Sequence, residues 1–390
     1  MNRPVDGLKG RISLVLCHCA GMIDIVALPV WVGIVLIGQY GLDPQRAGAL
    51  ATLFLGSVVA SSLFFSPRID RIRGTLAVPA GFGIAAAAFF ALSTTKDYGT
   101  MAALHVLGGL AVGCGLSFAH STMGSSANPH RLMAVAFIAL SVLSFGFLGA
   151  VPSLVQVQGG SLLFLILGAI MLVAALFALV GFPARQGKPL EPGKPVVHAP
   201  LTRSVWFAMV GTTLMTVSHA MMLSFLERIG VAHGFSQQQV LGVLLAVGVV
   251  NLFPGALAAI FERKVAAGAV MVAGPVLQGV LGLTLTQSPI FALYAVAAAA
   301  FPAVLIFTHT FIFGFLARND PSMRAPAATP VMAMSGSAIG PILGGAVAQN
   351  FGYANIGWTV AVFASIGVAC FWQARRGARQ AAVPVASPVH

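Results

Sequence analysis

The strongest constraint on this chain is a succession of apolar runs, each near the length that a helix needs to cross a lipid bilayer. The first run covers residues 12–38. The remaining eleven cover residues 46–66, 75–94, 100–120, 131–153, 161–182, 204–226, 238–260, 266–285, 289–316, 328–349 and 355–373. Composition agrees, because 58% of the residues are hydrophobic and only 8% are charged, unlike any soluble domain. We therefore predict an all-α membrane protein with twelve transmembrane helices.

The placement of the cations predicts how the chain is oriented in the membrane. With a cytoplasmic N-terminus, only Arg46, Lys96 and Arg228 of the 21 Lys and Arg residues fall on the opposite side. This asymmetry follows the positive-inside rule and predicts that both termini are cytoplasmic. The net charge of +12 is thus explained by the lipid bilayer, and no nucleic-acid partner is expected. The Ala- and Gly-rich composition favours a bacterial inner membrane, and we expect a monomer.

A polar linker divides the chain near its middle. Residues 183–203 are rich in Pro, Gly and Lys, which is typical of a linker. We predict a six-helix bundle over residues 1–182, a cytoplasmic linker over 183–203, and a second six-helix bundle over 204–390.

Three pairs of loops repeat at an offset of about 193 positions, which indicates internal duplication. The pairs are Gly41–Gln45 with Gly234–Gln238, Asp70-Arg71 with Glu262-Arg263, and Asn128–Arg131 with Asp320–Arg324. Many secondary transporters are built from such repeats, with the substrate site at the bilayer midplane between them.

An acidic residue lies near the middle of the first apolar run. Asp24 costs roughly 2.5–3.5 kcal/mol at such a position on insertion scales. We expect it to face the bundle interior or a wet cavity and to have a function. Removal from water favours the neutral form of a carboxyl group, so Asp24 is a candidate proton carrier.

The sequence offers no metal site and no catalytic centre. The four cysteines all lie in apolar runs. Cys17, His18 and Cys19 resemble a metal site, but successive helical residues point about 100° apart and cannot chelate together. No nucleophile with a positioned base and no phosphate-binding loop is present. We therefore expect no enzyme, no metal and no cofactor, with a proton gradient as the energy source.

Two short motifs resemble those of the major facilitator superfamily, and the resemblance extends over essentially the whole chain. The family's loop motif G-x-x-x-D-R-x-G-R-R has its Asp-Arg core at Asp70-Arg71, with Ser66 in place of the leading Gly. Its helix-four motif R-x-x-Q-G corresponds to His105–Gly109, so His105 stands at the arginine position. The resemblance implies the twelve-helix fold of that superfamily.

A third family motif, G-x-x-x-G-P-x-x-G-G, is complete in the eleventh run rather than in the fifth, where it marks antiporters. It comprises Gly336, Gly340, Pro341, Gly344 and Gly345. Small residues at this spacing also let helices pack closely and bend. Close packing and bending are therefore an alternative interpretation to an antiporter motif.

The resemblance implies that helices one, four, seven and ten line a central cavity. Each carries an ionisable residue inside its run, namely Asp24, His105, His219 and His309. Histidine titrates near physiological pH, so these residues form a candidate site for proton coupling and substrate binding. Alternatively, each His is a neutral buried side chain satisfied by a neighbour.

Further residues are assigned provisional roles. The candidate substrate contacts are Trp31, Met215, Met222, Asn251 and Gln278, although each can equally serve helix packing. Family resemblance implies that charged residues at the cytoplasmic ends of the helices gate the transporter by pairing across the halves. These are Asp70, Arg71, Arg131, Glu262, Arg263, Asp320 and Arg324.

The leading hypothesis is a secondary active transporter with alternating access that exports a small, moderately hydrophobic molecule in exchange for protons. No Lys or Arg lies deep in a run, which argues against an anionic substrate. One alternative is a proton symporter that imports a small metabolite. A second is a membrane sensor or scaffold that has lost transport.

Overall fold

A computed structural model describes residues 4–184, 201–262, 264–320, 325 and 329–382. Every long element is a helix. In chain order they are η1 (Pro4–Asp6), α1 (Leu8–Leu28), η2 (Pro29–Gln39), α2 (Pro44–Phe65), η3 (Ser66–Arg68), α3 (Gly74–Leu92), α4 (Tyr98–Gly124), α5 (Pro129–Gln158), α6 (Ser161–Gly181), α7 (Arg203–Ala232), α8 (Gln237–Val250), α9 (Pro254–Phe261), α10 (Ala267–Gln287), α11 (Phe291–Asn319), α13 (Thr329–Phe351) and α14 (Ala354–Ala382). Twelve spans in this part of the chain are long and apolar enough to cross a membrane, as predicted.

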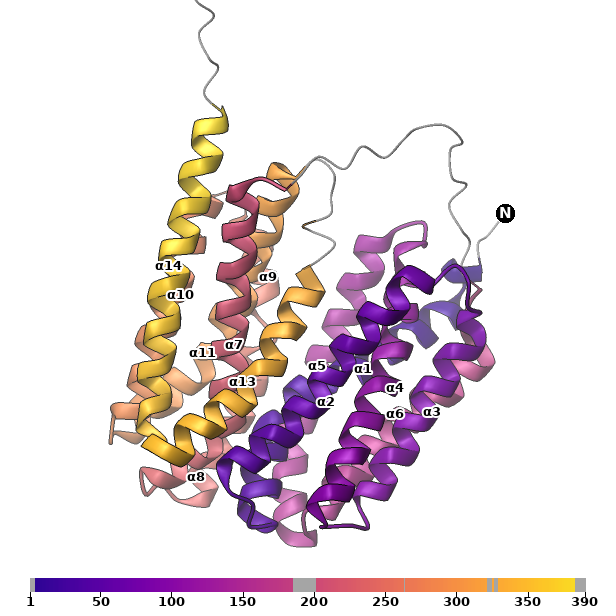
Figure 1. Cartoon of the computed structure of the whole chain (residues 1–390), viewed down its shortest axis with the longest axis horizontal. Coiled ribbons are helices and arrows are strands. Elements are labelled where there is room, and N and C mark those ends of the chain that lie inside the picture. Colours follow the sequence, from indigo (N-terminus) through magenta and orange to yellow (C-terminus); the bar gives the residue numbers. More distant parts are fainter. Residues whose placement is uncertain (1–3, 185–200, 263, 321–324, 326–328, 383–390) are drawn as a thin grey trace, which may run out of the picture.

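The helices gather into two bundles, α1–α6 and α7–α14, as Figure 1 shows. We call the end of the molecule where α6 ends and α7 begins the linker end, and the opposite end the far end. The two bundles lie close together toward the far end and diverge toward the linker end. The predicted bundle boundaries stay a prediction, because most of the linker, residues 185–200, lies outside the described residues.

Two spans change winding where the sequence contains proline. The first span is α-helical up to Leu28, and Pro29 begins the π-helical segment η2. The eighth span ends its first part at Val250 and resumes as α9 at Pro254. Proline lacks a backbone N–H and cannot continue the regular hydrogen-bond ladder, so both changes have a local cause.

Polar residues outside the spans fix several helix starts. Asp43, Asp97, Thr202 and Ser236 each accept a hydrogen bond from a backbone N–H in the first turn of the following helix. At Asp97 the backbone N–H and the hydroxyl of Thr100 both donate at 2.8 Å, and these bonds lower the pKa of the carboxyl. These side chains thus fix where the four helices begin.

Inside the first bundle, glycines let α4 approach α2 closely. A Cβ at Gly109 would collide with the carbonyl of Phe54, and one at Gly113 would collide with the carbonyl of Val58. The Ser61 hydroxyl donates to Leu110 O across the same contact at 2.6 Å. Lipid supplies little hydrophobic force between helices, so this close packing and the interhelical hydrogen bond hold the pair together.

Candidate functional site

Asp24 lies in the middle of the first span with its side chain enclosed by protein. The residue is 1% exposed. Its Oδ1 atom accepts a hydrogen bond from the backbone N–H of Ile25 at 2.8 Å, while Oδ2 has no hydrogen-bond partner among the described residues. A buried carboxylate with an unsatisfied oxygen is costly, whereas a protonated carboxyl group is neutral. Asp24 therefore faces the interior of the protein, and its predicted role in proton coupling stays a prediction.

The helix α1 packs against α4, and the two helices run antiparallel. Gly21, one turn before Asp24, faces α4, because a Cβ there would lie 2.7 Å from Leu116 Cδ1. Toward the linker end, His18 contacts His120 of α4, and their nitrogens Nδ1 and Nε2 are 2.9 Å apart. Along His18, Gly21 and Asp24, each residue is rotated by about 60° from the one before it, so His18 and Asp24 point about 120° apart around α1.

His105 lies on α4 within the first bundle, toward the far end. Its Nδ1 is 2.6 Å from Met101 O, and its Nε2 has no partner among the described residues. The ring stacks on Trp31, with centroids 5.2 Å apart, and meets Phe164 of α6 edge-on. Both His105 and Trp31 are 0% exposed, so this aromatic cluster is part of the core of the bundle in this conformation.

The candidate residues of the second bundle lie apart from Asp24. The His219 ring stacks on Phe301 with centroids 6.4 Å apart, and its Nδ1 has no partner among the described residues. His309 on α11 is half-buried. Within the described chain, no hydrogen bond or ring contact joins Asp24, His105, His219 and His309 to one another. A shared site for these four residues therefore stays a prediction.

The predicted substrate contacts are mostly buried here. Gln278 is 1% exposed and donates to Met215 O at 3.1 Å, which links α10 to α7. Met215 and Met222 are buried in α7. Asn251 caps the end of α8 at the break in the eighth span, and its Oδ1 has no partner among the described residues. These side chains support packing in this conformation, and their contact with a substrate stays a prediction.

The two bundles touch most closely where α2 meets α13 at the far end. A Cβ at Gly48 would collide with the carbonyl of Pro341, and one at Gly345 would collide with the carbonyl of Pro44. The Thr52 hydroxyl donates to Ala338 O at 2.6 Å in the same contact. Backbone therefore meets backbone between the halves.

The glycine motif of the eleventh span thus serves two faces of α13. Gly336, Gly340 and Gly344 recur every four residues and all contact α7 inside the second bundle. Pro341 and Gly345 instead contact α2 of the first bundle. Close packing of small residues accounts for this arrangement, and the predicted helix bending remains untested.

An ion pair of α7 forms a second far-end contact. The Arg228 guanidinium donates to both Glu227 oxygens, at 2.5 and 2.8 Å, and Glu227 is 3% exposed. A Cβ at Gly33 of η2 would lie 3.1 Å from Glu227 Oε2, and one at Gly38 would lie 2.6 Å from Arg228 Nη2. The two glycines are five residues apart, which is the spacing of hydrogen bonds in a π-helix. Both glycines lie on the side of η2 that faces α7.

The predicted gating residues lie at the linker end, where the halves diverge. Asp70 and Arg71 are exposed between η3 and α3, and Glu262 is exposed after α9. Asp320 is buried and accepts a hydrogen bond from Ala325 N at 2.7 Å. Arg263 and Arg324 lie outside the described residues. Among the described residues no ion pair crosses between the bundles, so the predicted pairing stays untested.

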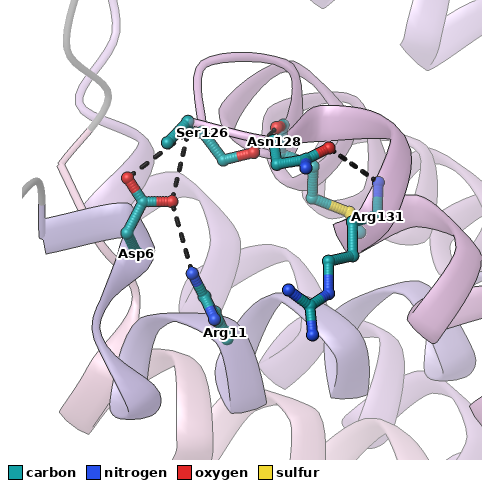
Figure 2. Close-up of polar contacts among 7 residues, drawn as sticks. Asp6, Arg11, Ser126, Asn128 and Arg131 are labelled. Carbon is teal, nitrogen blue, oxygen red and sulfur yellow. Dashed lines mark hydrogen bonds and ion pairs between the residues drawn. The ribbon is translucent and has the colours of Figure 1, made fainter.

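The same end of the first bundle is held by its N-terminal segment. Asp6 accepts hydrogen bonds from Ala127 N at 3.1 and 3.3 Å and pairs with Arg11 at 3.8 Å. Asn128 Oδ1 accepts from Arg131 N at 3.2 Å, and Figure 2 shows the Arg131 guanidinium apart from the carboxylate of Asp6. The start of α1 is therefore fixed to the α4–α5 turn.

Two helical bundles (Figure 1) with twelve spans long and apolar enough to cross a membrane have the architecture of a polytopic membrane protein. Residues 14–329 match the Major Facilitator Superfamily, which is more than half of the sequence. The chain belongs to the Major Facilitator Superfamily, whose members are transporters. No curated protein matches the chain.

Solved structures with this fold cover nearly the whole chain. A bacterial homologue of the human lysosomal transporter Spinster, in an inward-facing and occupied conformation, shares 14% identity at a TM-score of 0.74, with 96% of this chain and 98% of that chain covered. Its unoccupied form gives a TM-score of 0.71 with the same identity and coverage. The nucleoside transporter NupG, solved as a point mutant, shares 12% identity at a TM-score of 0.72, with 95% of this chain and 99% of that chain covered. At these identities the likeness concerns the fold.

Proposed function

We propose that this protein is a proton-coupled secondary transporter that exports a small, moderately hydrophobic molecule by alternating access. The observation that carries the proposal is Asp24, a carboxyl group enclosed at mid-membrane with one oxygen left without a partner among the described residues. Such a group binds and releases a proton as its surroundings change between two conformations.

The contacts between the halves support an alternating mechanism. The far end is closed by α2 on α13 and by the Glu227–Arg228 pair against η2. The bundles diverge at the linker end (Figure 1). If the linker is cytoplasmic, as the cation distribution predicts, this arrangement opens inward. In the second state of the transporter these far-end contacts would be broken, and they would re-form when the protein returns to the first state.

The energy available from one proton is sufficient for useful export. A proton moving down a potential of roughly 150 mV releases about 3.5 kcal/mol. That free energy sustains a gradient of roughly 400-fold for a neutral substrate. The Lys and Arg residues of the described spans lie near the helix ends. None of them is therefore placed in the middle of a span, where it could bind an anionic substrate.

The test is proton movement in liposomes that contain the purified protein and a pH-indicator dye. Wild type and Asp24→Asn are compared over a panel of hydrophobic cations, neutral apolar compounds and nucleosides. We expect substrate-dependent proton movement in wild type and its loss in Asp24→Asn, with substrate exchange at equal concentrations retained. The sign of the movement separates export from import.

The matched control is Asp43→Asn. Asp43 caps α2 outside the membrane and accepts from Arg46 N at 2.8 Å, a bond that asparagine can also accept. This control should leave proton coupling intact. Proton movement that persists in Asp24→Asn would contradict the proposal.

A further inference from the structure

A polar cavity lies at the far end of the first bundle, away from the proposed coupling site. It has a volume of about 300 Å³ and lies between the end of η2, the α3–α4 turn and the start of α6. Every lining residue other than Gly159 and Gly160 carries a hydroxyl, amide or ammonium group, and the lining includes no carboxylate. The cavity therefore combines polar walls with a positive charge, which comes from Lys96.

The walls of the cavity are fixed by contacts between the segments that form them. Gln39 Nε2 donates to Val155 O at 2.9 Å, which ties the end of η2 to α5. A Cβ at Gly160 would lie 2.8 Å from Tyr40 Cε1, so the Tyr40 ring packs against the start of α6. These contacts hold the cavity open in the shape that a ligand would meet.

Lys96 keeps its charge without a carboxylate partner among the described residues. Its Nζ lies over the Tyr40 ring, 5.0 Å from the centroid, and this cation–π contact holds the ammonium group beside the cavity. The neighbouring Asp97 carboxylate accepts the backbone N–H and the hydroxyl of Thr100, each at 2.8 Å, at the start of α4. Within the described chain it forms no ion pair with Lys96.

The other two cations of the far end differ from Lys96 in this respect. Arg46 pairs with Asp43 at 3.5 Å, and Arg228 pairs with Glu227. The one far-end cation that lines the cavity is thus also the one that the described residues leave without a carboxylate. An anion in the cavity would supply the missing partner.

We propose that this cavity binds a phosphate group. Lys96 pairs with the phosphate charge, and the hydroxyls of Tyr40 and Ser161, which make no hydrogen bond within the described chain, donate to the phosphate oxygens. The proposal is independent of the proton coupling at Asp24.

Two sources supply a phosphate group at the surface of a membrane, namely the headgroup of an anionic phospholipid and phosphate ion in solution. The cavity lies at the ends of spans, which is the level of lipid headgroups. Leu165, about one turn into α6 from Ser161, is 43% exposed, so an acyl chain has an apolar surface to lie on below a bound headgroup. The experiment separates the two sources.

The experiment follows thermal unfolding of the full-length, delipidated protein in a neutral detergent and a phosphate-free buffer. Phosphatidylglycerol, diacylglycerol with the same acyl chains, or inorganic phosphate is titrated in, and the rise in Tm gives an apparent Kd. Lys96→Gln should raise the Kd at least about tenfold, because it removes the charge-assisted contact. Thr94→Trp keeps the charge but fills the cavity, and it should weaken binding as well.

The matched control is Arg46→Gln. It removes the same charge at the same end of the molecule, but Arg46 does not line the cavity. Its Kd should stay within about twofold of wild type, since an exposed ion pair contributes little.

Each outcome decides the proposal. Stabilisation by phosphatidylglycerol that both test variants weaken, and that diacylglycerol does not reproduce, supports the site with a lipid headgroup as its ligand. The same pattern with inorganic phosphate supports the site with the free ion as its ligand. The site is overturned if neither phosphate compound stabilises wild type, if diacylglycerol stabilises it equally, if Arg46→Gln weakens binding as much as Lys96→Gln, or if either test variant binds as wild type does.

Discussion

At the residue scale, this chain places its ionisable side chains in pairs or alone, each with a different physical cost. Glu227 is buried yet satisfied by two hydrogen bonds from Arg228. Asp24 is buried and only half satisfied among the described residues. A paired charge stabilises a contact, whereas an unsatisfied carboxyl group is a candidate for proton exchange. The structure therefore distinguishes an acid with a cationic partner from a half-satisfied one, and the function of Asp24 stays a proposal.

Arg228→Gln should destabilise the protein by about 3 kcal/mol, because it leaves the Glu227 carboxylate buried without its cation. The double variant Glu227→Gln with Arg228→Gln should recover most of that loss, since neither side chain is then charged. Thermal unfolding in detergent measures the stability of both variants. An equal loss of stability in the single and double variants would show that the ion pair does not account for the destabilisation.

Sequence reasoning found Asp24 because an acid within an apolar run is conspicuous from one segment alone. It missed the contact of His18 with His120, since that pair depends on the register of α1 against α4. The same limit applies to His105 and Trp31, whose stacking inside the first bundle could not be read from positions within separate helices.

At the scale of elements, glycine positions decide how near the helices come. The α2–α13 contact joins the two bundles through Gly48 and Gly345, each opposite a carbonyl of the other helix. By contrast, Gly56 of α2 has no atom within 4 Å of the place where a Cβ would stand. Two kinds of glycine thus occur on one helix, and only one kind is required for closure of the far end.

Gly48→Ala and Gly345→Ala should each shift the protein toward opening of the far end. Overpacking of this kind costs about 1–3 kcal/mol, which corresponds to roughly a 5- to 150-fold change in the ratio of the two conformations. Distances between spin labels placed on the far-end turns report the shift. Gly56→Ala is the control, and an unchanged distance distribution in the two test variants would contradict the expectation.

Helix number and approximate bounds could be predicted because hydropathy and length act within each segment. The structure extends α7 to Ala232, beyond the predicted residue 226, and this extension includes Glu227 and Arg228, whose pairing inside the protein average hydropathy does not reveal. The break after Val250 was also missed, although Pro254 marks it in the sequence. Predictions failed where a neighbour or a proline overrides average hydropathy.

At the scale of the whole molecule, charge distribution and shape lead to one orientation. The far end carries Arg46, Lys96 and Arg228, of which Arg228 is paired with Glu227 and Arg46 with Asp43. The linker end carries most of the remaining cations. If the cation-rich linker end is cytoplasmic, as the positive-inside rule predicts, the arrangement opens inward.

A fluorescent protein fused after residue 390 should fold and fluoresce, because the C-terminus is expected in the cytoplasm, whereas a periplasmic phosphatase fused there should stay inactive. Fusion of the two reporters after Lys96, in the far-end turn before α4, should give the opposite pattern. Identical patterns at both positions would contradict the predicted orientation.

The backbone contact between α2 and α13 has a consequence for how such a transporter changes over time. Because main-chain atoms rather than side chains make the closest approach between the halves, replacements elsewhere on these helices leave that approach intact. Other positions on these two helices are therefore free to vary while closure of the far end is preserved. New substrates can then be accommodated without rebuilding that closure.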